Sequence, residues 1–200
     1  MTARESILGS IRTALNRRAG QNPGPPPAVA PCLPVQTPAD RAALFAQRLE
    51  KLAGHCFFAP TPAAAGDYVR ALVQGKRAIA APAPFLIECG ITGFPEASLD
   101  QADIGITSAD YALADTGTLV LLASASQPRL VSLLPPVHVA VFPRSAILTS
   151  LDELFAVLPN PAEQTSSMVL ITGPSRTADI EQILVRGVHG PGAIHAVIVD

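Results

Sequence analysis

Residues 37–81 read TPADRAALFAQRLEKLAGHCFFAPTPAAAGDYVRALVQGKRAIAA, and this stretch decides the fold. Thr37 and Pro38 suit the cap and first position of a helix. A second helix is predicted over Pro62–Gly75, and short apolar runs predict strands at Cys56–Ala59 and Arg77–Ala81. Because helices alternate with strands, the pattern favours a parallel sheet covered by helices.

The rest of the chain continues this alternation. A helix is predicted over Leu151–Leu158 with Ser150 as its cap, while Phe85–Cys89 is ambiguous. Further strands are predicted at Asp103–Thr107, Thr118–Ala123, Val137–Phe142, Met168–Thr172 and Ile194–Val199. We therefore expect an α/β domain over residues 39–200, with an open, mostly parallel sheet flanked by helices.

The N-terminal part differs in composition from the rest. Thr2 and Glu5 have the spacing of a capping box, so residues 1–19 are predicted to form a helix that ends at Gly20. Residues 20–38 contain seven prolines, which fix φ and remove amide donors. This segment is predicted to be an extended linker between a separate helix and the main domain.

Composition excludes several classes of function. The chain has 200 residues, of which 48% are hydrophobic and 15% charged, and its net charge of -2 does not favour nucleic acid. No apolar run reaches the ~18 residues of a membrane span, and the start does not resemble a signal peptide, so we expect a cytoplasmic protein. Three cysteines without a C-x-x-C pair and four histidines without metal-site spacing predict no metal and no cofactor in this chain.

In open α/β sheets ligands bind beyond the carboxyl ends of strands, and three loops are expected to lie there. The first is Ala112–Thr118, in which Asp115, Thr116, Gly117 and Thr118 follow one another. The two hydroxyls can donate to a carboxylate or phosphate, the glycine permits close approach, and Asp115 is a candidate base or nucleophile. The alternative is an ordinary turn held by side-chain hydrogen bonds.

The second loop follows the predicted strand at Met168–Thr172. Backbone amides, hydroxyls and one guanidinium predict an anion cradle there, with Asp179 as a further ligand-binding residue and Glu181 as a candidate catalytic carboxylate. The cradle consists of Gly173, Pro174, Ser175, Arg176 and Thr177. In the alternative interpretation Arg176 pairs with one of the two carboxylates. Neither a Walker loop nor G-x-G-x-x-G is present.

The third loop is Gly187–Gly192, in which His189 lies among glycines and a proline. His189 is a candidate proton carrier and Gly190 a candidate ligand contact. His138 heads a predicted strand and is a candidate for the same pocket. The alternative for both histidines is a structural hydrogen bond.

Together these segments resemble the signature of the LUD domain family, and in particular its short, single-domain lactate-utilisation protein C type. The resemblance covers residues from about 40 to 200 and rests on four segments: Ala109–Ala112, Asp115–Val120, Leu133–His138 and Thr172–Pro191. It implies a fold like that of sugar-phosphate isomerases and coenzyme A transferases. Many relatives have Glu where this chain has Asp115, which keeps the negative charge but shortens the side chain by one methylene.

The resemblance also implies a function. It implies work beside an iron–sulfur protein and an oxidoreductase-like subunit in the oxidation of lactate to pyruvate, with a small anionic ligand bound here. A second hypothesis is a free-standing enzyme on phosphorylated or coenzyme-A-linked acids, which would use Asp115 or Glu181 as nucleophile or base. A third is a non-catalytic scaffold that docks through its N-terminal helix.

Overall fold

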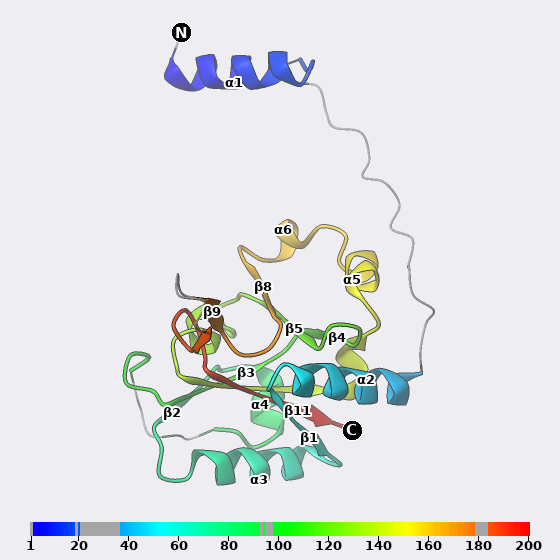
Figure 1. The fold of residues 1–200 in the computed structure, drawn as a ribbon, viewed down its shortest axis with the longest axis vertical. Helices are drawn as coiled ribbons and strands as arrows, with labels where there is room; N and C mark the ends of the chain where they lie inside the picture. The colour runs from blue at the N-terminus through cyan, green and yellow to red at the C-terminus, as the bar shows by residue number, and fades with distance from the viewer. Residues whose placement is uncertain (1, 19, 21–36, 93, 95–97, 179–183) are drawn as a thin grey trace.

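The structure is a computed structural model that describes residues 2–18, 20, 37–92, 94, 98–178 and 184–200. Its central element is a five-stranded, all-parallel sheet in the order β1-β11-β6-β3-β2 (Figure 1). These strands are β1 (His55–Ala59), β2 (Ala78–Ala80), β3 (Ile104–Ser108), β6 (Val137–Pro143) and β11 (Ala193–Val199). The predicted open parallel sheet is therefore confirmed.

One face of this sheet is covered by α3 (Pro62–Val73) and α4 (Pro84–Glu88). Val69 and Leu86 are fully buried against strand residues such as Ile106 and Val139. The ambiguous segment Phe85–Cys89 is thus mostly helical. Its start is set by Pro84 at the first helical position, because proline is tolerated where no amide donor is needed.

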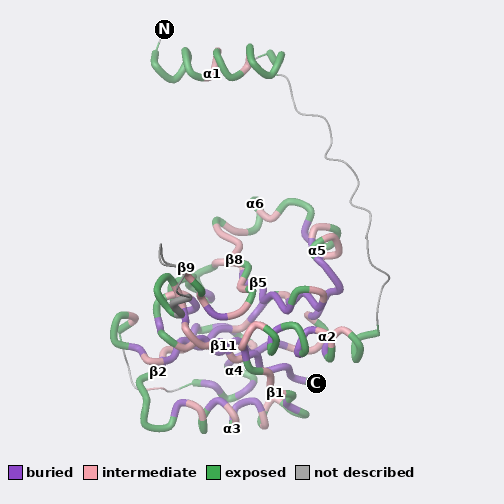
Figure 2. Tube along the Cα trace, in the orientation of Figure 1, coloured by how far each residue is buried: buried purple, intermediate pink, exposed green. Residues whose placement is uncertain are grey.

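The opposite face is covered by α2 (Pro38–Lys51) and by a second sheet. The Thr37 side chain accepts a hydrogen bond from the Asp40 amide at 3.2 Å, so the predicted helix start is confirmed. Phe45 of α2 is fully buried and its ring meets that of Phe142 edge-on at 5.7 Å. Buried residues concentrate where these layers meet (Figure 2).

The second sheet was not predicted. It is a four-stranded mixed sheet in the order β7-β4-β5-β8. Its strands are β4 (Tyr111–Leu113), β5 (Thr118–Leu122), β7 (Ile147–Leu148) and β8 (Met168–Ile171). β5 and β8 match predicted strands, but the prediction that Ala112 and Leu113 belong to a loop is wrong, because both pair with β5 and β7.

Short elements complete the fold. The predicted helix after Ser150 is α5 (Leu151–Val157), but Ser150 makes no side-chain capping bond. Instead the Glu153 carboxylate accepts a hydrogen bond from the Thr149 amide at 2.6 Å. The remaining short elements are the 3-10 helices η1 (Arg129–Ser132) and η2 (Arg144–Ala146), the helix α6 (Pro161–Gln164), and an unpredicted hairpin of β9 (Arg176–Ala178) and β10 (Leu184–Arg186).

The predicted N-terminal helix forms as α1 (Ala3–Ala14), which ends before the predicted stop at Gly20. The Thr2 amide donates to the Glu5 carboxylate at 2.7 Å and the Glu5 amide donates to the Thr2 hydroxyl at 3.3 Å, which is a complete capping box. None of its residues is buried, and Ile7, Ile11 and Leu15 are 60%, 48% and 59% exposed. Most of the predicted linker, residues 21–36, lies outside the described residues.

Candidate functional site

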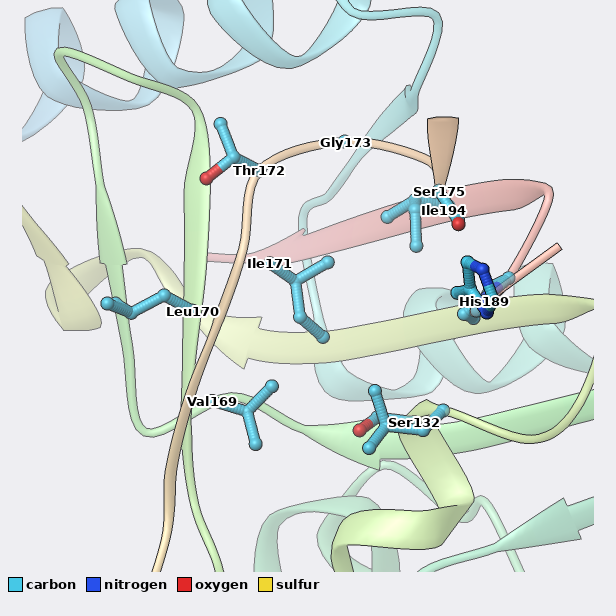
Figure 3. A pocket seen from close by; sticks show the side chains of 12 residues that line it. Ser132, Val169, Leu170, Ile171, Thr172, Gly173, Ser175, His189 and Ile194 are labelled. Atoms are coloured by element: carbon cyan, nitrogen blue, oxygen red, sulfur yellow. The ribbon is translucent and has the colours of Figure 1, made fainter. Parts of the chain in front are cut away.

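A cavity of about 180 Å³ opens beside β8, where the second sheet meets the central one. In Figure 3, Val169 and Ile171 of β8 point into it, whereas Leu170 points the opposite way. The far wall comes from the segments that precede β6 and β11. The lining residues are Ser132, Leu133, Val169, Leu170, Ile171, Thr172, Gly173, Ser175, His189, Gly190, Pro191 and Ile194.

The cavity joins two of the three predicted loops. The Ser175 amide donates to the Pro191 carbonyl at 2.9 Å, and the Gly187 amide donates to the Ser175 carbonyl at 3.1 Å. These bonds hold the segment after β8 against the segment before β11. Gly173, Ser175, His189 and Gly190 therefore line one space, with Pro174 buried between two of them.

The expected position at the carboxyl ends of strands holds only in part. Gly173 follows β8, but His189 and Gly190 precede β11, and Ser132 precedes β6. The cavity therefore lies at the amino ends of β6 and β11 in the central sheet. The expectation was wrong for the His189 loop, because Gly187–Gly192 precedes β11 in the chain and therefore lies at the amino end of that strand.

Arg176 does not line the cavity. Its guanidinium donates to the carbonyl of Leu52, the residue that caps the C-terminus of α2. A cation at this position complements the partial negative charge of the last helical carbonyls. Thr177 follows it in β9. Asp179 and Glu181, the two proposed carboxylates of this segment, lie outside the described residues.

The Thr116-Gly117-Thr118 turn packs on α2 and contacts Thr172, which lines the cavity. Gly117 has φ +67°, and a Cβ atom there would lie 2.6 Å from the Leu49 amide nitrogen. The Thr118 hydroxyl lies 2.8 Å from the hydroxyl of Thr116 and 2.8 Å from that of Thr172, which is a lining residue. Because these hydroxyls bond one another, the turn joins β5 to β8.

Asp115 stands at the start of the same turn and does not line the cavity. Its amide donates to the Thr149 carbonyl at 3.1 Å, and its carboxylate accepts a hydrogen bond from the Thr116 hydroxyl at 3.3 Å. The side chain is partly exposed. Both bonds are of the kind expected if this loop is an ordinary turn, the alternative interpretation of its sequence.

His138 lies below the cavity and is fully buried. Its Nε2 is 2.9 Å from the Thr107 hydroxyl, while its Nδ1 has no hydrogen-bond partner among the described residues. In the β6–β11 register His138 is opposite Ile194, a lining residue. Burial lowers the pKa of His138 to about 3, so the imidazole is neutral at physiological pH.

The sequence that forms these segments is similar to those of known proteins. Residues 95–199, more than half of the chain, match the LUD domain. The chain belongs to the LUD domain family. Its sequence is 47% identical over 96 residues to lactate utilization protein C of Halalkalibacterium halodurans, which is 46% of this chain and 42% of that one. The corresponding protein of Bacillus subtilis is 42% identical over 96 residues, or 46% and 40% of the two chains.

The matched part of this LUD protein thus spans less than half the length of these curated relatives. A crystal structure of a DUF162 family protein from Deinococcus radiodurans resembles the fold with a TM-score of 0.63. The similarity covers 82% of this chain and 99% of that one at 21% sequence identity. At that identity the likeness supports the α/β fold alone.

The cavity of this LUD domain has little charge. Among its described lining residues there is no Lys, Arg, Asp or Glu, and His189 is the titratable group at its rim. The polar lining groups are the side chains of Ser132, Thr172, Ser175 and His189. Such a site can hold a neutral or singly charged molecule by hydrogen bonds, but it offers a polyanion no fixed counter-charge.

Sequence reasoning missed the floor of this cavity. Val169, Ile171 and Ile194 belong to apolar strands, and nothing in an apolar run distinguishes a wall of a cavity from an ordinary core. Ser132 precedes the Leu133–His138 signature segment, so its position next to that motif was a usable signal.

The two cysteines that the structure describes, Cys56 and Cys89, lie outside the cavity lining. Burial first and Glu50 second raise the pKa of the Cys56 thiol to about 12, and burial with Glu88 raises that of Cys89 to about 11. Both thiols are therefore protonated at neutral pH. Within the described residues no three His, Cys, Asp or Glu side chains converge on a metal-sized space, and no helix there is long and apolar enough to cross a membrane.

Proposed function

We propose that this chain is a component of L-lactate utilisation that binds a small organic acid and carries no redox centre of its own. The observation that carries the proposal is the cavity that joins Gly173 and Ser175 to His189 and Gly190. These residues come from separate parts of the C-terminal family signature. The name of the curated relatives, lactate utilization protein C, supports the choice of acid.

Cavity size and charge support a short monocarboxylate. The volume of about 180 Å³ is below the roughly 300–1,000 Å³ of pockets for drug-sized ligands. The Ser175 hydroxyl can donate to a carboxylate, and the apolar floor of Val169, Ile171 and Ile194 suits a methyl group. A phosphorylated or coenzyme-A-linked acid would need cationic side chains, which the described lining lacks.

The oxidation itself is assigned to partners. Converting lactate to pyruvate removes two electrons and two protons, and electron acceptance needs a redox group. We assign that group to an iron–sulfur protein and an oxidoreductase-like subunit acting with this chain in the cytoplasm. The exposed apolar residues of α1 provide a surface for such an association, since they contact none of the described core.

Calorimetric titration with L-lactate, pyruvate, inorganic phosphate and acetyl-coenzyme A tests the ligand assignment. We expect saturable binding of lactate or pyruvate, weakened at least about tenfold by Ser175→Ala combined with His189→Ala, because each removes a hydrogen bond to a charged group. Arg176→Ala is the matched control and should retain binding, since Arg176 contacts Leu52. Binding of phosphate or acetyl-coenzyme A without either acid would contradict the proposal and favour the free-standing enzyme.

A further inference from the structure

Two histidines meet on the face of the central sheet opposite the cavity. His55 opens β1 and His195 is its register partner on the parallel strand β11. Their rings stack with centroids 4.7 Å apart and planes 27° apart. The hydroxyl of Tyr68, on α3, lies 3.1 Å from Nδ1 of His195. Figure 1 places β1, β11 and α3 side by side at this edge of the sheet.

We propose that His55 and His195 bind a divalent transition metal ion of the Zn²⁺, Ni²⁺ or Cu²⁺ class, and that Tyr68 is a positioning residue for His195. Imidazole nitrogen is a preferred ligand of these ions. Metal-bound histidines usually have their second ring nitrogen held by a hydrogen bond, which fixes the tautomer and the ring orientation. The Tyr68 hydroxyl occupies that second position at Nδ1, so Nε2 of His195 is left for the metal.

The two histidines differ in how far they reach solvent. His195 is partly buried, and the positive charge of Lys76 lies near it. His55 is exposed, which gives an ion access from solvent. The facing groups are therefore His55 on β1, Tyr68 on α3 and Lys76 beyond α3.

Metal binding requires the exposed His55 ring to turn out of the stack, because an ion lies in the plane of each imidazole ring that binds it and these two planes are stacked only 27° apart. Two nitrogens bound to one tetrahedral ion at about 2.0–2.1 Å each must lie closer together than the stacked ring centres. The His55 side chain can turn to provide this, whereas His195 is held by Tyr68. No third His, Cys, Asp or Glu among the described residues joins the pair, so water completes the coordination.

Phe57 supports the positioning role of Tyr68. Its ring stacks on that of Tyr68 with centroids 4.2 Å apart and planes 7° apart. Phe57 lies on β1 two residues after His55, so both side chains are on the same face of the strand. The stack holds the Tyr68 ring while its hydroxyl reaches His195. Spacing along the sequence cannot reveal this site, because parallel pairing joins residues from opposite ends of the domain.

Titration of the full chain with Zn²⁺ or Ni²⁺ alone tests the proposal. We expect saturable binding of one ion per chain, at least tenfold weaker in His55→Ala, and about 10–100-fold weaker in Tyr68→Phe because the outer hydrogen bond is lost. Lys76→Met should strengthen binding by removing a nearby positive charge. His189→Ala, which removes a different exposed histidine, is the control and should bind as the unchanged protein does.

Nitrogen chemical shifts of the histidine side chains give a second readout that a purely structural role would not move. The Nε2 resonance of His195 should shift on metal addition, while those of His138 and His189 should not. Equal affinity in His55→Ala and the unchanged protein would overturn the proposal, as would the absence of saturable binding. His55 is exposed, so its substitution should leave folding intact, which circular dichroism checks.

Discussion

Gly117→Ala tests whether the Thr-Gly-Thr turn of the family signature is a structural contact. Gly117 has φ +67°, a conformation that costs an L-residue roughly 1–2 kcal/mol. The added Cβ would also lie 2.6 Å from the Leu49 nitrogen and 2.9 Å from the Arg48 carbonyl carbon, both backbone atoms of α2. Such overpacking typically costs about 1–3 kcal/mol.

The two costs sum to about 2–5 kcal/mol, offset by about 0.4–1 kcal/mol because alanine restricts the unfolded chain. The variant Gly75→Ala separates the conformational strain from the steric clash with α2. Gly75 has φ +73°, but nothing lies within 4 Å of the position that a Cβ atom would take, so only conformational strain remains there. We expect Gly117→Ala to lose more of the unfolding free energy than Gly75→Ala by about 1–3 kcal/mol.

Urea unfolding of the two variants and the unchanged protein measures this difference. Equal losses in both variants would refute the reasoning, because the contact with α2 would then contribute nothing. The same variants also distinguish a structural role of Gly117 from a role in ligand binding. If Gly117 instead approached a bound ligand, Gly117→Ala would weaken ligand binding while its stability fell no further than that of Gly75→Ala.

Buried and exposed groups give three further predictions. Burial lowers the pKa of His138 to about 3, so the unfolded state takes up a proton at this residue first, and the His138 contribution to the unfolding free energy should fall by about 2 kcal/mol between pH 7 and pH 5. Urea titrations at the two pH values should show a smaller fall in His138→Gln than in the unchanged protein. Ile11→Asp should leave the melting temperature unchanged but weaken co-elution with the proposed iron–sulfur partner, whereas Thr13→Asp, outside the apolar stripe, should not. Thr118→Val should cost about 1 kcal/mol in thermal unfolding, because the hydroxyl of Thr172 loses its partner.

Local patterns predicted the central sheet because each of its strands is a short apolar run bounded by turn residues. The same patterns could not predict the second sheet. β5 and β8 were recognised as strands, but periodicity does not identify a strand's neighbour. The segments Tyr111–Leu113 and Ile147–Leu148 are too short to show any period, and only their pairing with β5 and with each other makes them strands.

In the candidate site, too, local sequence predicted some residues, whereas contacts between distant parts of the chain could not be predicted. Ser175 and His189 were identified as candidates because one follows a Gly-Pro turn and the other lies among glycines, where a polar side chain has little reason to lie in a core. The surroundings of Arg176 depend on Leu52, which is far away in the sequence, so no local pattern could place its guanidinium at the end of α2. The proposed roles of Asp179 and Glu181 stay predictions, since both lie outside the described residues.

The start of β11 connects the cavity to the histidine pair. Ile194 lines the cavity, and the next residue, His195, faces α3 on the other side of the sheet. Consecutive strand residues point to opposite faces, so a shift of this strand end moves both side chains at once. Binding free energies at two linked sites are coupled reciprocally. If a metal ion at His195 shifts this strand end, it changes the affinity of the cavity for an acid by the same factor by which the acid changes the affinity for the metal, and calorimetric titrations of the acid with and without Zn²⁺ measure that factor.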